Sequence, residues 1–195
     1  MKNAKINRMV GIALLMAIVV VMQFLGGILT TASGFSISLV LIPIVLGAAV
    51  YGPGAGALLG ATFGVIVFLN CVNGTDLGGA MVFQANPFLC FVVVLGKGIL
   101  AGLAAGWIYK LIANKSKYIA MLLAAIVCPV VNTGVFVVCM LTFFMDVLSA
   151  WAEGGDVIAY IMTALVLANF VPELVINVVF SPASVQTIRV VGKRK

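Results

Sequence analysis

Residues 92–110 read VVVLGKGILAGLAAGWIYK, a stretch of apolar and small residues with one lysine near its start. A transmembrane helix needs about 20 consecutive residues that are mostly apolar, so this stretch is long enough to cross a bilayer. Lys97 interrupts it, and an ammonium group without a partner costs roughly 2.5–3.5 kcal/mol at the centre of a membrane helix. The stretch therefore predicts a membrane-spanning helix in which the lysine needs a specific reason to be present.

The whole chain has the composition of an integral membrane protein. Of its 195 residues, 64% are hydrophobic and 8% are charged, whereas soluble domains carry about 25% charged residues. The net charge of +6 comes from basic residues spread along the chain, which argues against a nucleic-acid partner. The chain has no histidine, and its cysteines lack the spacing of metal ligands, so we expect no metal and no cofactor. These cysteines are Cys71, Cys90, Cys128 and Cys139.

Six apolar runs predict an all-α membrane protein with six transmembrane helices in a single domain, residues 1–195. The expected spans are 8–29, 36–52, 54–72, 87–110, 119–144 and 157–181. An even number of spans places both termini and the loop between the fourth and fifth spans on one side. Every lysine and arginine except Lys97 falls on that side, and the acidic loop residues fall on the other. The positive-inside rule then predicts cytoplasmic N and C termini.

Glycines recur at every fourth position around the third and fourth spans. They are Gly52, Gly56, Gly60 and Gly64, followed by Gly98, Gly102 and Gly106. Residues four apart share one face of a helix, and glycine on that face lets two helix backbones approach closely. The pattern predicts compact packing inside the bundle, with a sliding or partner-binding face as the alternative.

The segment between the third and fourth spans reads NGTDLGGAMVFQANPF, residues 73–88. Its glycines are typical of a mobile loop. Asn86 and Pro87 suit the cap and first turn of the following helix. Gln84 and Asn86 are also candidates to contact a polar ligand.

Lys97 and Glu173 are the two charged residues predicted inside spans. Counted from the basic flanks of their helices, the two lie at similar depths. They are expected to pair if the fourth and sixth spans are neighbours, and pairing offsets much of the cost of burying each charge. The sequence leaves open whether such a pair is only structural or also takes part in binding a ligand.

The last two spans each carry polar side chains close to a proline, Pro129 or Pro172. The polar residues are Asn132, Thr133, Asn169, Glu173 and Asn177. A proline leaves one carbonyl of the preceding turn without its helical donor, and an amide in hydrocarbon needs a hydrogen-bond partner or a cavity. These residues indicate either the lining of a cavity or hydrogen bonds between helices.

Several motifs that would mark an enzyme are absent. The chain contains no GxxxxGK[ST] phosphate-binding loop and no GxSxG nucleophile motif. Lys97 and Glu173 alone are a poor constellation for acid–base chemistry. We therefore expect no enzymatic activity in this chain, and in particular no ATP hydrolysis by the P-loop route.

The order and spacing of five segments resemble those of a known family over nearly the whole chain. The segments are RMVGIALLMAIVVV (8–21), LIPIVLGAAVYGPGAGALLGATFGV (41–65), LGKGILAGLAAGWIYKLI (95–112), CPVVNTGVFVV (128–138) and VPELVINVVFSPASVQTIR (171–189). Together they resemble the substrate-binding S component of energy-coupling factor (ECF) vitamin transporters. The resemblance implies a protein of the prokaryotic plasma membrane that binds a vitamin or related micronutrient near the outer face. It also implies partners: a membrane coupling subunit, the T component, with two cytoplasmic ATPases.

The resemblance further implies which residues dock on the coupling subunit and which region binds the ligand. Small alanines of the first span form the docking face for the coupling subunit in this family, and Ala13 and Ala17 fit that AxxxA pattern. The family's ligand site lies among the last three spans and the outer loops. By position and polarity, this region contains Gln84, Asn86, Lys97, Asn132, Thr133, Asn169 and Glu173.

A cationic Lys97 suits a ligand that bears a carboxylate, such as pantothenate, and SISLVLIPIVLG (36–47) is similar to the pantothenate group of the family. Trp107 and Trp151 are expected near the membrane ends, so the site is not expected to be rich in aromatic residues, which disfavours a flat flavin ring. The alternative function is a self-sufficient small secondary transporter or channel. That alternative requires a polar stripe through the full depth or an inverted repeat, and the first three spans are almost free of polar groups.

Overall fold

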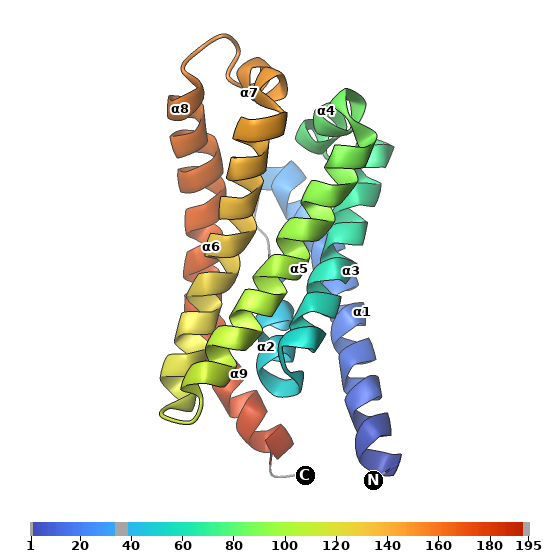
Figure 1. Cartoon of the computed structure of the whole chain (residues 1–195), viewed down its shortest axis with the longest axis vertical. Coiled ribbons are helices and arrows are strands. Elements are labelled where there is room, and N and C mark those ends of the chain that lie inside the picture. The colour runs from blue at the N-terminus through green and yellow to red at the C-terminus, as the bar shows by residue number, and fades with distance from the viewer. Residues whose placement is uncertain (1, 34–38, 193–195) are drawn as a thin grey trace.

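The chain folds into a bundle of helices, and the computed structural model describes residues 2–33 and 39–192 (Figure 1). The structure is 90% helical and has no strand among the described residues, which confirms the all-α prediction. In chain order the helices are α1 (Lys2–Ser33), α2 (Leu41–Tyr51), α3 (Pro53–Asn73), α4 (Leu77–Ala85), α5 (Pro87–Ile112), α6 (Lys117–Phe143), α7 (Met145–Trp151), α8 (Val157–Tyr160), the π-helix η1 (Ile161–Phe170) and α9 (Val171–Gly192).

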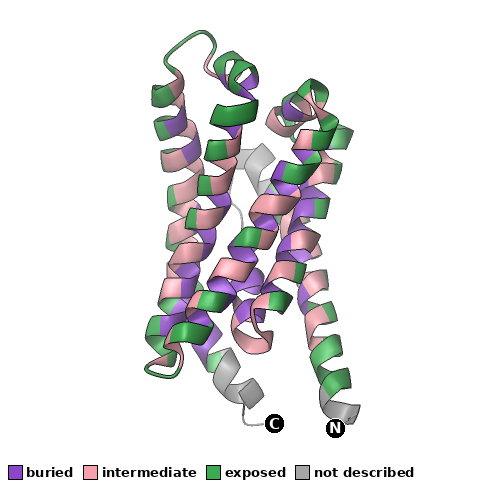
Figure 2. Ribbon diagram, in the orientation of Figure 1, coloured by how far each residue is buried: buried purple, intermediate pink, exposed green. Residues whose placement is uncertain are grey.

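Five helical segments of the described chain are long and apolar enough to cross a membrane, and α2 is a shorter apolar helix. The last of the five is formed by α8, η1 and α9, which follow one another without a break. Six membrane helices thus fit the structure if the short α2 is counted with the five. Buried residues line the inward faces of these helices and exposed residues lie outside (Figure 2).

Helix α2 begins later than the span predicted at 36–52. It starts at Leu41, and Leu39 and Val40 are not helical; residues 36–38 lie outside the described residues. Pro43 explains the late start, because proline has no N–H and fits only the first turn, where helix N–H groups have no partner within the helix. The apolar run therefore extends beyond the helix that it contains.

The segment predicted as a mobile glycine-rich loop contains the helix α4, so that prediction was wrong. Asp76 caps this helix, with its Oδ1 accepting a hydrogen bond of 2.9 Å from the backbone N–H of Gly79. An aspartate at this position satisfies one of the free N–H groups of the first turn. The capping signal of Asp76 outweighs the local effect of Gly78 and Gly79 on the secondary structure.

The glycines of α3 and α5 bring the two helix backbones into direct contact, which confirms the predicted compact packing inside the bundle. A Cβ atom built on Gly60 would meet the carbonyl oxygen of Gly98, and one built on Gly56 would meet that of Gly102. One turn further on, a Cβ on Gly64 would lie 2.7 Å from the carbonyl oxygen of Val94. The contact is therefore internal packing. Four-residue spacing included Gly52 by mistake: it precedes α3, has a φ of 95°, and forms the turn from α2.

The last long helix contains a π-helical stretch of ten residues, η1. The sequence indicated an irregularity near Pro172 but not its form. The π-helical turns end at Phe170, directly before the turn that contains Pro172. Long π-helices are rare, and π-helical turns occur frequently at functional sites.

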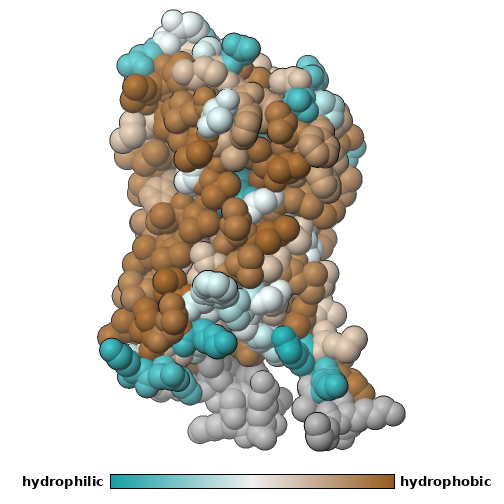
Figure 3. Space-filling model, in the orientation of Figure 1, coloured by the Kyte–Doolittle hydropathy of each residue, from teal (hydrophilic) through white to brown (hydrophobic). Residues whose placement is uncertain are grey.

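The two ends of the bundle differ in charge. Arg8, Lys110, Lys115 and Lys117 lie at the end where the N and C termini are found, which we call the basic end. The acidic loop residues lie at the opposite, acidic end: Asp76, Asp146, Glu153 and Asp156. Between these ends the visible face is mainly apolar (Figure 3). The bundle thus has the polarity of a multi-pass membrane protein.

Candidate functional site

Lys97 lies inside the bundle, between α3, α5 and α6. Its Nζ is 4.6 Å from the ring centroid of Phe136 on α6 and 5.9 Å from that of Phe63 on α3. A cation within about 6 Å of an aromatic ring face is attracted by the quadrupole of the ring. The two rings account for part of the cost of placing Lys97 here, and they fix its ammonium at the centre of three helices.

Glu173, on α9, is 2% exposed. Helices α5 and α9 do not pack directly against each other in the described part of the chain, whereas α6 packs against both. The backbones of the fourth and sixth spans are therefore not in direct contact, and the pairing of the long Lys97 side chain with Glu173 stays a prediction.

Asn132 and Thr133, on α6, are two further buried polar residues. They are 6% and 7% exposed, and within the described residues Asn132 Oδ1 and Thr133 Oγ1 have no hydrogen-bond partner. They precede Phe136 by four and three residues, so they lie one turn away on the same side of α6. Lys97 lies about 15 Å along α5 from Pro87, and Asn132 about 16 Å along α6 from Phe143. The ammonium and the two oxygen atoms therefore lie at similar depths from the acidic end.

An aromatic cluster lies between these polar groups and the acidic end. The rings of Phe136 and Trp151 are stacked with centroids 6.5 Å apart, and those of Trp151 and Tyr160 are 6.3 Å apart. Trp151 lies at the acidic end of the bundle, as expected, but α7 folds back and stacks its ring on Phe136. Trp107, in contrast, is 65% exposed near the basic end, as expected. No local pattern in the sequence reveals this cluster, whose members come from α6, α7 and α8.

The remaining candidates lie further from Lys97 along their helices or have another role. Gln84 is exposed at the end of α4. Asn86 caps α5, with its Oδ1 accepting a hydrogen bond of 3.0 Å from the N–H of Leu89, which confirms the capping interpretation. Asn169 is half-buried in the last turn of η1. The structure thus places Lys97 and the pair Asn132 and Thr133 at similar depths on the neighbouring helices α5 and α6, and leaves Gln84 at the acidic surface.

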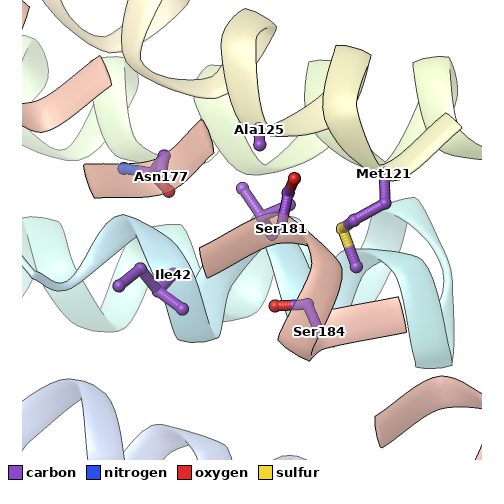
Figure 4. Close-up of a pocket in the computed structure, with 7 residues that line it drawn as sticks. Ile42, Met121, Ala125, Asn177, Ser181 and Ser184 are labelled. Atoms are coloured by element: carbon purple, nitrogen blue, oxygen red, sulfur yellow. The ribbon is translucent and has the colours of Figure 1, made fainter. Parts of the chain in front are cut away.

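A separate polar stripe follows α9 toward the basic end. Asn177, Ser181 and Ser184 face Ile42 of α2 and Met121 and Ala125 of α6 (Figure 4). The Asn177 side chain donates a 2.8 Å hydrogen bond to the backbone oxygen of Glu173, one turn back on the same helix. The pocket among these residues is too narrow to admit a water molecule. This part of the stripe is dry packing, satisfied within α9, rather than a ligand cavity.

Ala13 and Ala17 are both exposed on α1. The opposite face of the helix packs inward through Leu15 and Val19. The small side chains therefore lie on the outer surface of the bundle, where another membrane helix can approach closely.

No three His, Cys, Asp or Glu side chains come together as a metal site in the described ranges. Lys97, Asn132 and Thr133 offer an ammonium, an amide and a hydroxyl. Such a set recognises an anionic or hydrogen-bonding organic molecule better than a metal ion.

A protein family and a known transporter each match the chain over almost its full length. The sequence profile of a family described as "ECF transporter, substrate-specific component" matches residues 7–184. The chain is also 25% identical over 199 residues to the pantothenic acid transporter PanT of Lactococcus lactis subsp. cremoris (strain MG1363), an alignment that covers 96% of each protein. Both matches include the helices that carry Lys97, Asn132 and Glu173.

Proposed function

Because the chain belongs to the family of substrate-specific components of ECF transporters, we propose that it binds a carboxylate-bearing vitamin, with pantothenate as the first candidate. The ligand enters from the acidic end, which faces the outside of the cell, and the basic end with both termini faces the cytoplasm. The charge asymmetry of the two ends supports this orientation.

One observation carries the proposal: two buried oxygen atoms without partners, Asn132 Oδ1 and Thr133 Oγ1, near a lysine inside the membrane part of the bundle. An unsatisfied buried polar atom costs about 1–3 kcal/mol, and a ligand that supplies the missing bonds recovers this cost. A carboxylate binds the Lys97 ammonium, while hydroxyl or amide N–H groups of the same molecule donate to Asn132 and Thr133. Pantothenate carries all three kinds of group.

The similarity to the Lactococcus protein supports the same ligand. The Lactococcus protein is called a pantothenic acid transporter. The aromatic cluster of Phe136, Trp151 and Tyr160 covers the polar groups toward the acidic end and excludes water from the bound molecule. Of the remaining candidates, Glu173 acts on the charge of Lys97, Gln84 contacts the ligand on its way in, and Asn86 and Asn169 complete the polar surface.

The proposal is tested by screening the purified chain against the B vitamins and their precursors by thermal shift and native mass spectrometry. Pantothenate is expected to raise the unfolding midpoint, because a ligand at 1,000 times its Kd adds about 4 kcal/mol of stability. Biotin and thiamine serve as comparisons of similar size. Stabilisation by a vitamin without a carboxylate, with none by pantothenate, would contradict the proposed recognition by Lys97.

The same proposal includes the family's partners, a membrane coupling subunit and two ATPase subunits, because this chain lacks a P-loop motif. Ala13→Trp is expected to abolish ATP-dependent uptake in cells while the purified variant binds its ligand normally. A tryptophan at this exposed position prevents close approach of a partner helix and has no neighbour to displace within the bundle. Leu14→Trp, also on the exposed face, controls for bulk. Normal uptake by the Ala13 variant removes the docking role, and uptake without an ATPase partner identifies a self-sufficient transporter instead.

A further inference from the structure

A second cavity, of about 310 Å³, lies at the basic end of the bundle. Its walls come from the end of α2, the start of α3 and the end of α5, which meet at the bottom of Figure 1. Pockets of about 300–1,000 Å³ hold small molecules, so the cavity is large enough for a small polar group. The lining residues that matter here are Gly52, Pro53, Gly106, Tyr109, Lys110 and Asn114.

Small residues shape this cavity. Gly106 allows α5 to approach the start of α3, because a Cβ atom there would lie 2.5 Å from the Cα of Pro53. Gly52 turns the chain between α2 and α3 with a φ of 95°, a conformation that side chains rarely adopt. The backbone therefore lies open to a ligand at the point where α3 begins.

The charges around the cavity favour an anion. Lys110 is exposed on its rim, and the N-terminus of α3, a helix of 21 residues, carries the positive end of the helix dipole. None of the described residues that line the cavity is acidic. The acidic loop residues lie at the opposite end of the bundle. Both contributions, a full positive charge and a helix N-terminus, meet in one place.

A tyrosine hydroxyl is available beside the same cavity. Tyr109 is 8% exposed and lines the cavity, and in the described part of the chain no hydrogen bond of its hydroxyl to the protein is found. The hydroxyl is not among the fully enclosed polar atoms, so it can donate to a group bound in the cavity. Tyr109 and the rim residue Lys110 thus offer two donors to one cavity.

The depth of the cavity in the membrane indicates the kind of anion. Trp107, three residues before Lys110, is 65% exposed, and exposed tryptophans of membrane helices concentrate at the level of the lipid headgroups. Basic pockets between helices at this level bind anionic lipid headgroups. We propose that the cavity binds the phosphate of an anionic glycerophospholipid, with Lys110 and Tyr109 as its donors.

The test uses the purified full chain with phosphatidylglycerol, phosphatidylcholine or soluble glycerol 3-phosphate, and measures lipid retained in native mass spectra and the unfolding midpoint. Phosphatidylglycerol is expected to be retained in preference to phosphatidylcholine. Lys110→Gln is expected to lower its retention about fivefold, the effect of one basic residue near an anionic surface. Lys117→Gln, at the same end but outside the cavity, is the matched control and is expected to change retention little.

Tyr109→Phe keeps the ring in place and removes only the hydroxyl. It therefore tests whether this hydroxyl contributes to lipid retention without disturbing the fold. Equal retention of the two lipids, or equal losses in the Lys110 and Lys117 variants, overturns the proposal. If glycerol 3-phosphate stabilises the protein as strongly as phosphatidylglycerol does, the cavity binds a soluble phosphate ester, and the proposal of a lipid ligand is overturned. The readout does not involve the vitamin, so this inference stands or falls separately from the proposed function.

Discussion

Lys97→Met is expected to lower the affinity for the carboxylate ligand by between about 30-fold and several thousand-fold. Removing one partner of a buried charged contact costs about 2–5 kcal/mol. Methionine matches the length of the lysine stem and packs well against aromatic rings, so the contacts with Phe63 and Phe136 are largely preserved. Titration of the purified variant with pantothenate, followed by calorimetry, measures the loss. Lys97→Arg, which keeps the positive charge, is expected to retain most of the affinity.

The Lys97 variant also removes the positive charge that is predicted to pair with Glu173, so it is expected to be less stable than the parent protein. The double variant Lys97→Met with Glu173→Gln removes both charges and avoids leaving a buried carboxylate without compensation. If this double variant folds and binds the ligand as tightly as the parent, the lysine has only a structural role. A loss of affinity in the folded double variant assigns Lys97 to the ligand site.

Gly98→Ala is expected to lower the free energy of unfolding by about 3 kcal/mol or more, which is large for one added methyl group. The new Cβ atom would meet the carbonyl oxygen of Gly60 on α3. A backbone oxygen cannot rotate away as a side chain does, so α3 and α5 must separate along their length. Thermal unfolding in detergent measures the change, with ligand omitted so that only the bundle is tested.

Gly96→Ala is the matched control for this substitution. Gly96 lies two residues earlier on the same helix, and a Cβ atom built there meets no atom within 4 Å. Alanine at such a helical position is neutral or stabilises by about 0.4–1 kcal/mol. Equal unfolding midpoints for the two variants would contradict the idea that backbone contact between α3 and α5 holds the bundle together.

Local patterns predicted much of this fold. Apolar runs identified the long helices because a membrane span must be apolar over its whole length. Four-residue glycine spacing predicted close packing inside the bundle, although not that α3 and α5 form the contact. The start of α2 was placed too early because apolar composition does not mark where a helix begins, whereas Pro43 does. The helix α4 was not predicted because its glycines are typical of a mobile loop, although Asp76 is a good helix cap.

The sequence identified the polar residues of the proposed site but not their surroundings. Lys97, Asn132 and Thr133 were identified because a polar side chain in a membrane helix is costly and needs a reason. The stacking of Trp151 on Phe136 depends on how α7 folds back over the bundle, which is a long-range contact without a local signal. For the same reason, the separation of α5 from α9 by α6 was not predictable from depth alone.

The short helix α2 fills the half of the bundle that lies toward the basic end. It packs against α1, α3, α5, α6 and α9, and its 11 residues extend about 16 Å from Tyr51. Gly106 of α5 lies against Pro53, just after the end of α2, so Lys97, nine residues before Gly106, lies about level with the start of α2. Leu41 and Ile44, both fully buried, are in the first turn of α2. Between Lys97 and the basic end, α2 therefore contributes buried apolar side chains, and the polar groups of the bundle interior lie beside or beyond its start.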